Sequence, residues 1–210
     1  MITYPSADFV QKLKQEALVK TRGLPLYEEG PGVDYSKAPH AYALNATLLY
    51  DPYGSPEQMR KRGPGSESSI LLVERAGGHG QPRTFSGVSG YLNPWTSADP
   101  IAETLREELE TECHFRRRQF DEIEFYAGRP TVEPRTQVPG AMITVVPILG
   151  LCCTRPDVVV NPEELLSYRW VHLPSIRWTS RLAKNYLEVT LPSALAAIGI
   201  EGEALARLIG

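Results

Sequence analysis

The feature that most limits how this chain can fold is the acidic segment at residues 99–115, DPIAETLREELETECHF, which is predicted to be a helix from Asp99 to about His114. Asp99 is a residue type that often caps a helix, and Pro100 suits the first helical position. At about 100° per residue, Ile101 and Leu105 fall on one apolar arc of this helix. The segment therefore predicts an amphipathic helix with one face against a core.

Two of the glutamates on this helix lie beside the apolar arc. With Glu108 as the origin, Glu112 falls at about 40°, between Ile101 and Leu105. The other glutamates point to the opposite, solvent side: Glu103, Glu107 and Glu110. Carboxylates near apolar surface repel each other and resist desolvation unless a positive charge neutralises them. An oxygen-preferring divalent cation is one such partner, and the alternatives are a buried ion pair and a partly exposed helix end.

Patterns typical of strands occur on both sides of this helix. Alternating or continuous apolar runs predict strands at 40–50, 69–74, 85–92, 120–127, 142–153 and 168–173, of which the strand at 85–92 is interrupted by glycine. Helical spacing predicts an N-terminal helix over 6–20 and a mostly helical end over 175–208, interrupted near Pro192 and Gly199. This mixture predicts an α/β fold in which helices pack on a mixed sheet.

Two connecting segments contain residues that resemble phosphate-binding motifs. The turn at 76–80 contains His79 but lacks the Lys and Ser/Thr of a phosphate-binding loop. The stretch 59–69 contains Arg60-Lys61-Arg62 and is predicted to be a mobile surface loop, because charged runs are usually solvated; phosphate binding is the alternative.

Composition excludes several classes of function. The formal net charge of −3 gives no electrostatic reason to expect nucleic acid or an anionic membrane as a partner. No apolar run has the length of a membrane span, and the N-terminus has no apolar signal segment. Cys113, Cys152 and Cys153 are too few for a disulfide framework and predict thiols in a reducing compartment. We therefore expect a cytoplasmic protein, and the sequence leaves a homodimer open.

The helix and its surroundings resemble the Nudix hydrolases. The signature of that family is a glycine, a glutamate, and then Arg-Glu-apolar-x-Glu-Glu-x-Gly-apolar on a helix. In the best register, Glu108 and Glu112 match signature glutamates, Leu109 matches the apolar position, and Gly90 matches the opening glycine if a short insertion is allowed. A register with Arg106-Glu107 as the Arg-Glu pair would place Glu108 at the apolar position, against the helical wheel.

Three signature positions carry other residue types. Glu107 replaces the arginine, Thr111 replaces the first glutamate of the pair, and His114 replaces the closing glycine. The loss at Thr111 removes one metal ligand that the family pattern would supply. Outside the signature, the resemblance includes the apolar strand before it and the closing turn and strand, so that it covers about residues 40–178.

The resemblance implies a mixed sheet sandwiched between helices and a Mg²⁺-dependent (or Mn²⁺-dependent) hydrolase. The expected substrate is a small nucleoside diphosphate linked to another group. Glu108, Glu112 and the backbone of Gly90 would hold the metal. Glu133, in the predicted loop 129–140, is a candidate general base, with a solvated loop residue as the alternative. Substrate contacts are expected from Arg129 and from Trp95, for which core packing is the alternative.

The same residues allow two other functions. A Nudix-like module could bind a nucleotide or a protein without hydrolysing anything, and a diphosphate isomerase shares the fold. The expected organisation is an N-terminal helix and linker (1–39), a Nudix-like domain (40–178) and a C-terminal helical tail that packs on that domain (179–210).

Overall fold

The computed structural model describes residues 1–21, 34–75, 83–93, 95–135, 138–183 and 185–209. Within these ranges, nine strands form one mixed sheet. Their bounds are β1 Ile2–Thr3, β2 His40–Tyr50, β3 Ser69–Arg75, β4 Thr84–Ser86, β5 Val88–Tyr91, β6 Ile123–Ala127, β7 Thr131–Pro134, β8 Met142–Cys152 and β9 Leu165–His172.

Two long parallel strands, β2 and β8, form the centre of the sheet. They pair along their whole length, from His40 opposite Met142 to Tyr50 opposite Cys152. The outer edge of β2 is divided between two antiparallel strands: β5 pairs with the middle of β2, from Ala43 to Ala46, and β3 pairs with its last two residues. The outer edge of β8 is divided in the same way between β7 and β6.

The division beside β2 occurs at Gly87. A Cβ atom on Gly87 would lie 3.0 Å from the carbonyl carbon of Ala46 and closer still to its oxygen, so that only glycine fits there. The glycine-interrupted strand predicted over 85–92 is thus two elements divided at Gly87: β4 pairs with β3, whereas β5 pairs with β2.

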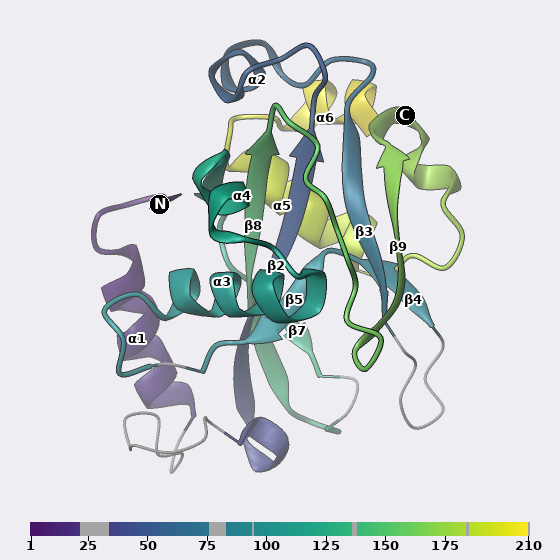
Figure 1. Ribbon diagram of the computed structural model, residues 1–210. Coiled ribbons are helices and arrows are strands. Elements are labelled where there is room, and N and C mark those ends of the chain that lie inside the picture. The colour runs from purple at the N-terminus through teal and green to yellow at the C-terminus, as the bar shows by residue number, and fades with distance from the viewer. Residues whose placement is uncertain (22–33, 76–82, 94, 136–137, 184, 210) are drawn as a thin grey trace.

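Helices cover both faces of the sheet (Figure 1). The acidic helix α3, Pro100–Cys113, covers one face, and the C-terminal elements η3, α5 and α6 lie on the other. Side chains alternate along β2, so Leu44 and Leu48 join the core beneath α3 while Leu49 joins the core with Leu191 of α5. The predicted α/β sandwich is confirmed. The helical bounds are α1 Phe9–Lys20, η1 Tyr35–Lys37, α2 Pro56–Arg62, α4 Arg117–Asp121, η2 Leu173–Trp178, η3 Tyr186–Thr190, α5 Leu191–Ala196 and α6 Gly202–Ile209.

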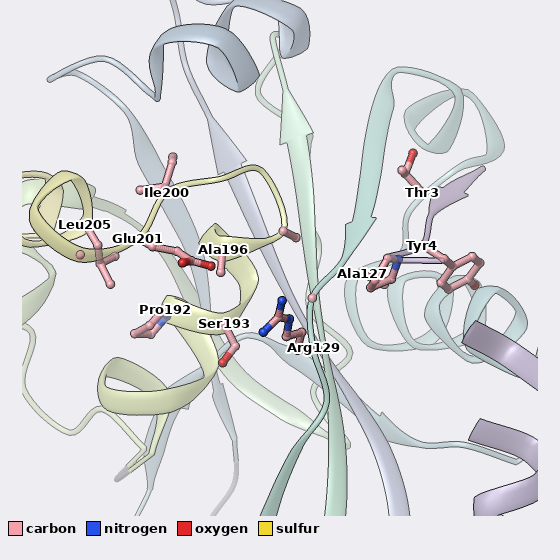
Figure 2. Close-up of a pocket in the computed structure, with 14 residues that line it drawn as sticks. Thr3, Tyr4, Ala127, Arg129, Pro192, Ser193, Ala196, Ile200, Glu201 and Leu205 are labelled. Carbon is pink, nitrogen blue, oxygen red and sulfur yellow. The ribbon is translucent and has the colours of Figure 1, made fainter. Parts of the chain in front are cut away.

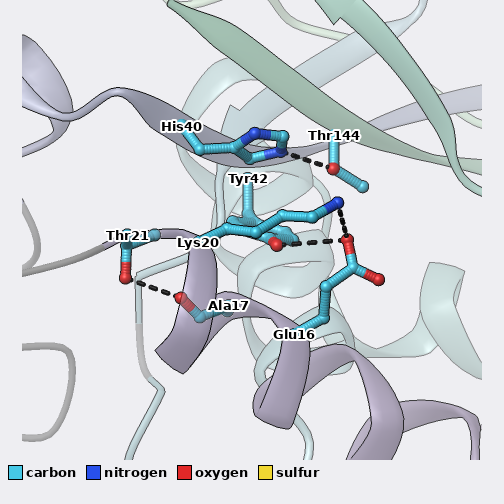
Figure 3. A network of polar contacts seen from close by, with 7 residues as sticks. All are labelled: Glu16, Ala17, Lys20, Thr21, His40, Tyr42 and Thr144. Carbon is cyan, nitrogen blue, oxygen red and sulfur yellow. Dashed lines mark hydrogen bonds and ion pairs between the residues drawn. The ribbon is translucent and has the colours of Figure 1, made fainter.

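The N-terminal helix α1 packs against the start of β2 through apolar and polar contacts. Leu13 and Ala17 are buried in the core beneath α3. Glu16 accepts hydrogen bonds from the Tyr42 hydroxyl at 3.2 Å and from Lys20 at 2.7 Å (Figure 3). These contacts attach the first part of the chain to the central sheet.

Other sequence predictions need correction or lie outside the described residues. The predicted loop at 59–69 is wrong because its first residues belong to α2, whose Met59 is buried and which begins at a capping box on Ser55. Pro192 does not interrupt a helix but lies at the start of α5. The turn at 76–80 and most of the linker at 23–39 lie outside the described residues. No described helix has both the length and the apolarity that crossing a membrane requires.

Candidate metal centre

The ends of α3 fix the direction in which its glutamates point. The Asp99 side chain accepts a hydrogen bond from the Ala102 backbone at 3.0 Å and another from the Tyr4 hydroxyl at 2.7 Å. The helix ends at His114, which has the left-handed conformation with φ of 50°. In this register Glu112 is only 1% exposed, whereas Glu110 is exposed. The burial difference predicted from the helical wheel is confirmed.

Three carboxylates meet at the inner face of α3. One oxygen each from Glu108, Glu112 and Glu164 lies within 4.8 Å of the other two. Glu164 comes from the turn before β9, and this turn is attached to α3 because the Asn161 N–H donates to the Glu112 carbonyl at 2.8 Å. The arrangement therefore brings a distant part of the chain to the two helical glutamates.

A glycine on β5 allows this close approach. Gly90 pairs with Leu44 on β2 and lies directly beneath α3. A Cβ atom at Gly90 would lie 2.6 Å from Glu108 Cγ, and the carboxyl atoms would be closer still. Any side chain at this position would displace Glu108, so the position of Glu108 depends on a glycine at residue 90. Their predicted roles in one metal site require such a direct contact.

One cation already balances part of the negative charge. The Arg75 guanidinium, at the end of β3, contacts the Glu112 Oε1 at 2.5 Å and also donates to the Ser89 carbonyl. The other Glu112 oxygen, Oε2, is buried and has no hydrogen-bond donor among the described residues. The buried ion pair that the sequence left open as an alternative is thus present, and it satisfies only one of the two oxygens.

The electrostatic setting makes the ionised carboxylates unstable in the absence of a further cation. Burial raises the pKa of Glu108 to about 8, and the nearby Glu112 carboxylate adds to this rise. Burial also raises the pKa of Glu112 to about 7, although the Arg75 guanidinium opposes the rise. Both shifts mean that burial disfavours the ionised carboxylates and that the Arg75 guanidinium does not fully offset this effect.

The donor set fits a hard divalent cation. Mg²⁺ and Mn²⁺ prefer carboxylate and other oxygen ligands. Glu108, Glu112 and Glu164 supply such oxygens, one of them buried without a donor. Three carboxylates against one guanidinium leave two formal negative charges, which matches the charge of one divalent ion.

The other predicted site residues are elsewhere in the fold. Glu133 lies on β7 rather than in a loop, and its carboxylate accepts a hydrogen bond from Asn185 at 2.6 Å. It pairs with Ile143 of β8, whereas Val146, three residues further on, faces α3. Because side chains alternate along a strand, Glu133 points to the opposite face of the sheet from the three-carboxylate cluster. The structure therefore does not support Glu133 as the base.

The two predicted substrate contacts also lie outside the cluster. Trp95 is completely buried and donates from its indole N–H to the Tyr35 hydroxyl at 2.6 Å, so the core-packing alternative is correct and no ring face is free for a substrate. Arg129 is exposed and lines a cavity of about 450 Å³ beside β1, α5 and α6, where Ser193 and Glu201 are neighbours (Figure 2). None of the residues that line this cavity belongs to the carboxylate cluster.

Two members of the site were not identified from the sequence. The turn that contains Glu164 and the strand that ends at Arg75 were recognised only as parts of the family resemblance, without a role in the site. The available signal was the unbalanced charge of Glu108 and Glu112, which required partners from outside the helix. Nothing in the local pattern indicated which residues these would be.

Solved structures with this architecture show what fold the chain has. The Nudix domain of NrtR from Shewanella oneidensis, solved with ADP ribose, aligns with a TM-score of 0.52 over 84% of this chain and 94% of that chain, at 13% identity. The chain has the Nudix fold. The MutT Nudix hydrolase from Burkholderia pseudomallei aligns with a TM-score of 0.48 at 13% identity, over 75% of this chain and 97% of that one. RenU, a Nudix hydrolase from M. smegmatis, aligns with a TM-score of 0.47 at 15% identity, over 70% of this chain and 80% of that one.

Sequence comparison does not detect this relationship. No family model matches the chain, and no curated protein matches it. The replacements in the Nudix signature, Glu107, Thr111 and His114, are consistent with this result. At such low identity the structural likeness establishes the Nudix fold, and the chemistry has to be argued from the site itself.

Proposed function

We propose that this chain is a divalent-metal-dependent hydrolase that cleaves the diphosphate of a nucleoside diphosphate derivative. The observation that carries the proposal is the cluster of Glu108, Glu112 and Glu164, in which Glu108 lies against Gly90. One buried oxygen of Glu112 has no hydrogen-bond donor in the described part of the chain. A Nudix domain that was solved with bound ADP ribose shares the fold, which supports a nucleoside diphosphate derivative as the ligand.

The cluster offers what diphosphate hydrolysis requires. Mg²⁺ bound there would neutralise phosphate oxygens and favour ionisation of a water molecule. Glu108 and Glu112 would hold the ion from α3, and Gly90 keeps Glu108 in place because no side chain intervenes. Arg75 orients Glu112 through the 2.5 Å contact, and its side chain is 39% exposed, so that it can also approach a phosphate oxygen.

Glu164 is the residue that we assign to proton transfer. Water attacks one phosphorus, the bridging P–O bond breaks, and the electron pair of that bond stays on the bridging oxygen. The proton of the water has to pass to a base within reach of the cluster. Glu164 is exposed and lies in the cluster, whereas Glu133 lies on the other face of the sheet.

A second candidate function is binding of a nucleotide without hydrolysis. The contact between Arg75 and Glu112 favours it, because the guanidinium occupies a carboxylate oxygen that a metal ion would otherwise bind. The exposed Thr111 favours it as well: its hydroxyl donates to the Glu107 carbonyl at 2.8 Å and offers no carboxylate to the cluster.

One experiment separates the two functions. The purified chain is incubated with ADP-ribose, a dinucleotide and a nucleoside triphosphate, in Mg²⁺, in Mn²⁺ and in EDTA, and the released products are separated by chromatography. Metal-dependent cleavage of a diphosphate bond in any of them supports the hydrolase. If no compound is cleaved but one of them raises the melting temperature, the chain is a binding module and the hydrolase proposal is wrong.

A further inference from the structure

A second cavity, of about 620 Å³, lies at the far end of the sheet between the end of α2 and α6. Figure 1 shows these two helices beside each other at the same end of the sheet. Four cationic residues line the cavity and come from both helices: Arg60, Lys61, Arg62 and Arg207. No acidic residue is among those that line it. The basic run of the sequence is thus part of a concave surface rather than of a mobile loop.

Two of the four cations are not neutralised by carboxylates. Lys61 forms an ion pair with Glu57 at 2.6 Å, and Arg60 is 3.9 Å from a carboxylate oxygen of Glu124. Arg62 and Arg207, in contrast, have no carboxylate within ion-pair distance among the residues that the structure describes. Cations in the last turn of α2 also complement the helix dipole, but that effect does not explain why a cation from a second helix shares the same cavity.

The wall of this cavity is held in place by a buried carboxylate. Asp51 is 4% exposed and accepts hydrogen bonds from the Gly65 N–H at 2.7 Å and from the Ser68 hydroxyl at 2.9 Å. Gly63, which ends α2, has φ of 78°, a conformation that strongly favours glycine. The loop after α2 is therefore shaped by specific contacts before any ligand arrives.

The lining of the cavity combines these cations with an apolar surface. Ile198, Leu208 and Pro174 contribute apolar side chains to it. A cavity of a few hundred Å³ with apolar walls and a few polar groups is typical of small-molecule sites. Arginine is well suited to bind phosphate oxygens through paired N–H donors. We propose that this cavity binds a small organic phosphate, with the phosphate at Arg62 and Arg207 and the apolar part on Ile198 and Leu208.

The proposed site is separate from the carboxylate cluster. Strand β9 runs between them, since Glu164 precedes its first residue and Pro174 follows its last. Its eight residues span roughly 26 Å at about 3.3 Å per residue. The two sites also lie on opposite faces of the sheet, because α6 packs in the core with Leu49 and α3 in the core with Leu44. Binding here needs no divalent metal.

The test uses the full chain in EDTA and isothermal titration with two probes, phenyl phosphate and inorganic phosphate. We expect saturable binding of phenyl phosphate that is at least tenfold tighter than that of inorganic phosphate and that weakens with added salt. The double variant Arg62→Gln/Arg207→Gln should lose at least tenfold in affinity. The matched control, Arg117→Gln/Arg118→Gln on α4, removes the same charge elsewhere and should bind like the wild type.

Three results would overturn the proposal. The first is the absence of saturable binding to a wild type that is shown by circular dichroism to be folded. The second is an equal loss in the control variant, which would indicate an effect of net charge only. The third is clearly tighter binding in Glu108→Gln, because removing a carboxylate that repels the anionic probe would then place the probe at the carboxylate cluster. Because the assay contains no divalent metal, each result is independent of whether the chain hydrolyses diphosphates.

Discussion

Replacing Gly90 by alanine tests the geometry of the metal centre with a single methyl group. The new Cβ would lie 2.6 Å from Glu108 Cγ and would overlap the carboxyl group, so that Glu108 has to leave the cluster. Gly90 does not have a positive φ, and alanine is therefore compatible with its backbone. The reduced freedom of the unfolded chain stabilises the variant by about 0.4–1 kcal/mol, which offsets the cost of moving one flexible side chain.

The variant should therefore separate stability from metal binding. We expect the free energy of unfolding in EDTA to change by less than about 1 kcal/mol, while Mg²⁺ affinity falls at least about tenfold, or about 1.4 kcal/mol. Denaturant titration measures the first quantity and calorimetric Mg²⁺ titration the second. Ser89→Ala, whose side chain points to the other face of β5, is the matched control and should change neither. Wild-type Mg²⁺ affinity in Gly90→Ala would refute the proposed ligand arrangement.

Further predictions concern the charge balance and the core. Arg75→Met should destabilise the metal-free fold by about 1–3 kcal/mol in denaturant titrations, less than for a fully buried pair because Arg75 is 39% exposed. Mg²⁺ should restore much of this loss, and an unchanged stability would show that the pair with Glu112 contributes nothing. The pKa values of Glu108 and Glu112 are raised from 4.5 on folding, so both carboxyl groups hold their protons more tightly in the folded state. Their contribution to the free energy of unfolding is therefore complete below about pH 4.5 and is lost as the pH rises through 7 to 8. The melting temperature in EDTA should therefore fall from pH 5 to 8.5 more steeply in the wild type than in Glu108→Gln; equal slopes would contradict the assignment. Tyr35→Phe removes the acceptor of the Trp95 N–H and should cost about 1–3 kcal/mol of stability without affecting turnover. A selective loss of turnover would instead place Trp95 at the substrate.

The parts of the fold with strong local patterns could be predicted from the sequence. The strand at His40–Tyr50 matches the predicted bounds, and the acidic helix begins and ends within one residue of the expected positions. The burial of Glu112 and the exposure of Glu110 follow from helical periodicity alone, since both depend only on the position of each residue around one helix.

Contacts between distant segments could not be predicted in this way. Arg75 and Glu112 are 37 residues apart, and their pairing depends on how β3 and α3 are placed by the sheet. The same limitation explains why Glu164 was missed as a site residue and why Glu133 was placed in a loop as a candidate base. Its strand β7 forms only because β8 offers a free edge, and the register of that pairing decides where its side chain points.

The short helix α2 was missed for a different reason. Its sequence is dominated by charged residues and flanked by glycines and prolines, which locally favour a loop. The helix is stabilised by the capping box at Ser55 and by burial of Met59, and only the second of these depends on the tertiary fold. The capping residues were therefore the available sequence signal.

The most direct test of the central claim compares three isosteric variants on one helix: Glu108→Gln, Glu112→Gln and Glu110→Gln. Initial rates of Mg²⁺-dependent diphosphate cleavage are measured beside melting temperatures in EDTA. Losing a charged metal ligand should reduce the rate at least about 100-fold, or about 2.7 kcal/mol, in the first two variants. The fold should tolerate both, because removing one of three clustered carboxylates relieves repulsion. Glu110→Gln, on the exposed side, should stay within about twofold of the wild type. Equal damage from Glu110→Gln and Glu112→Gln, or full activity in Glu108→Gln, would contradict the assignment of the three-carboxylate cluster as the metal centre.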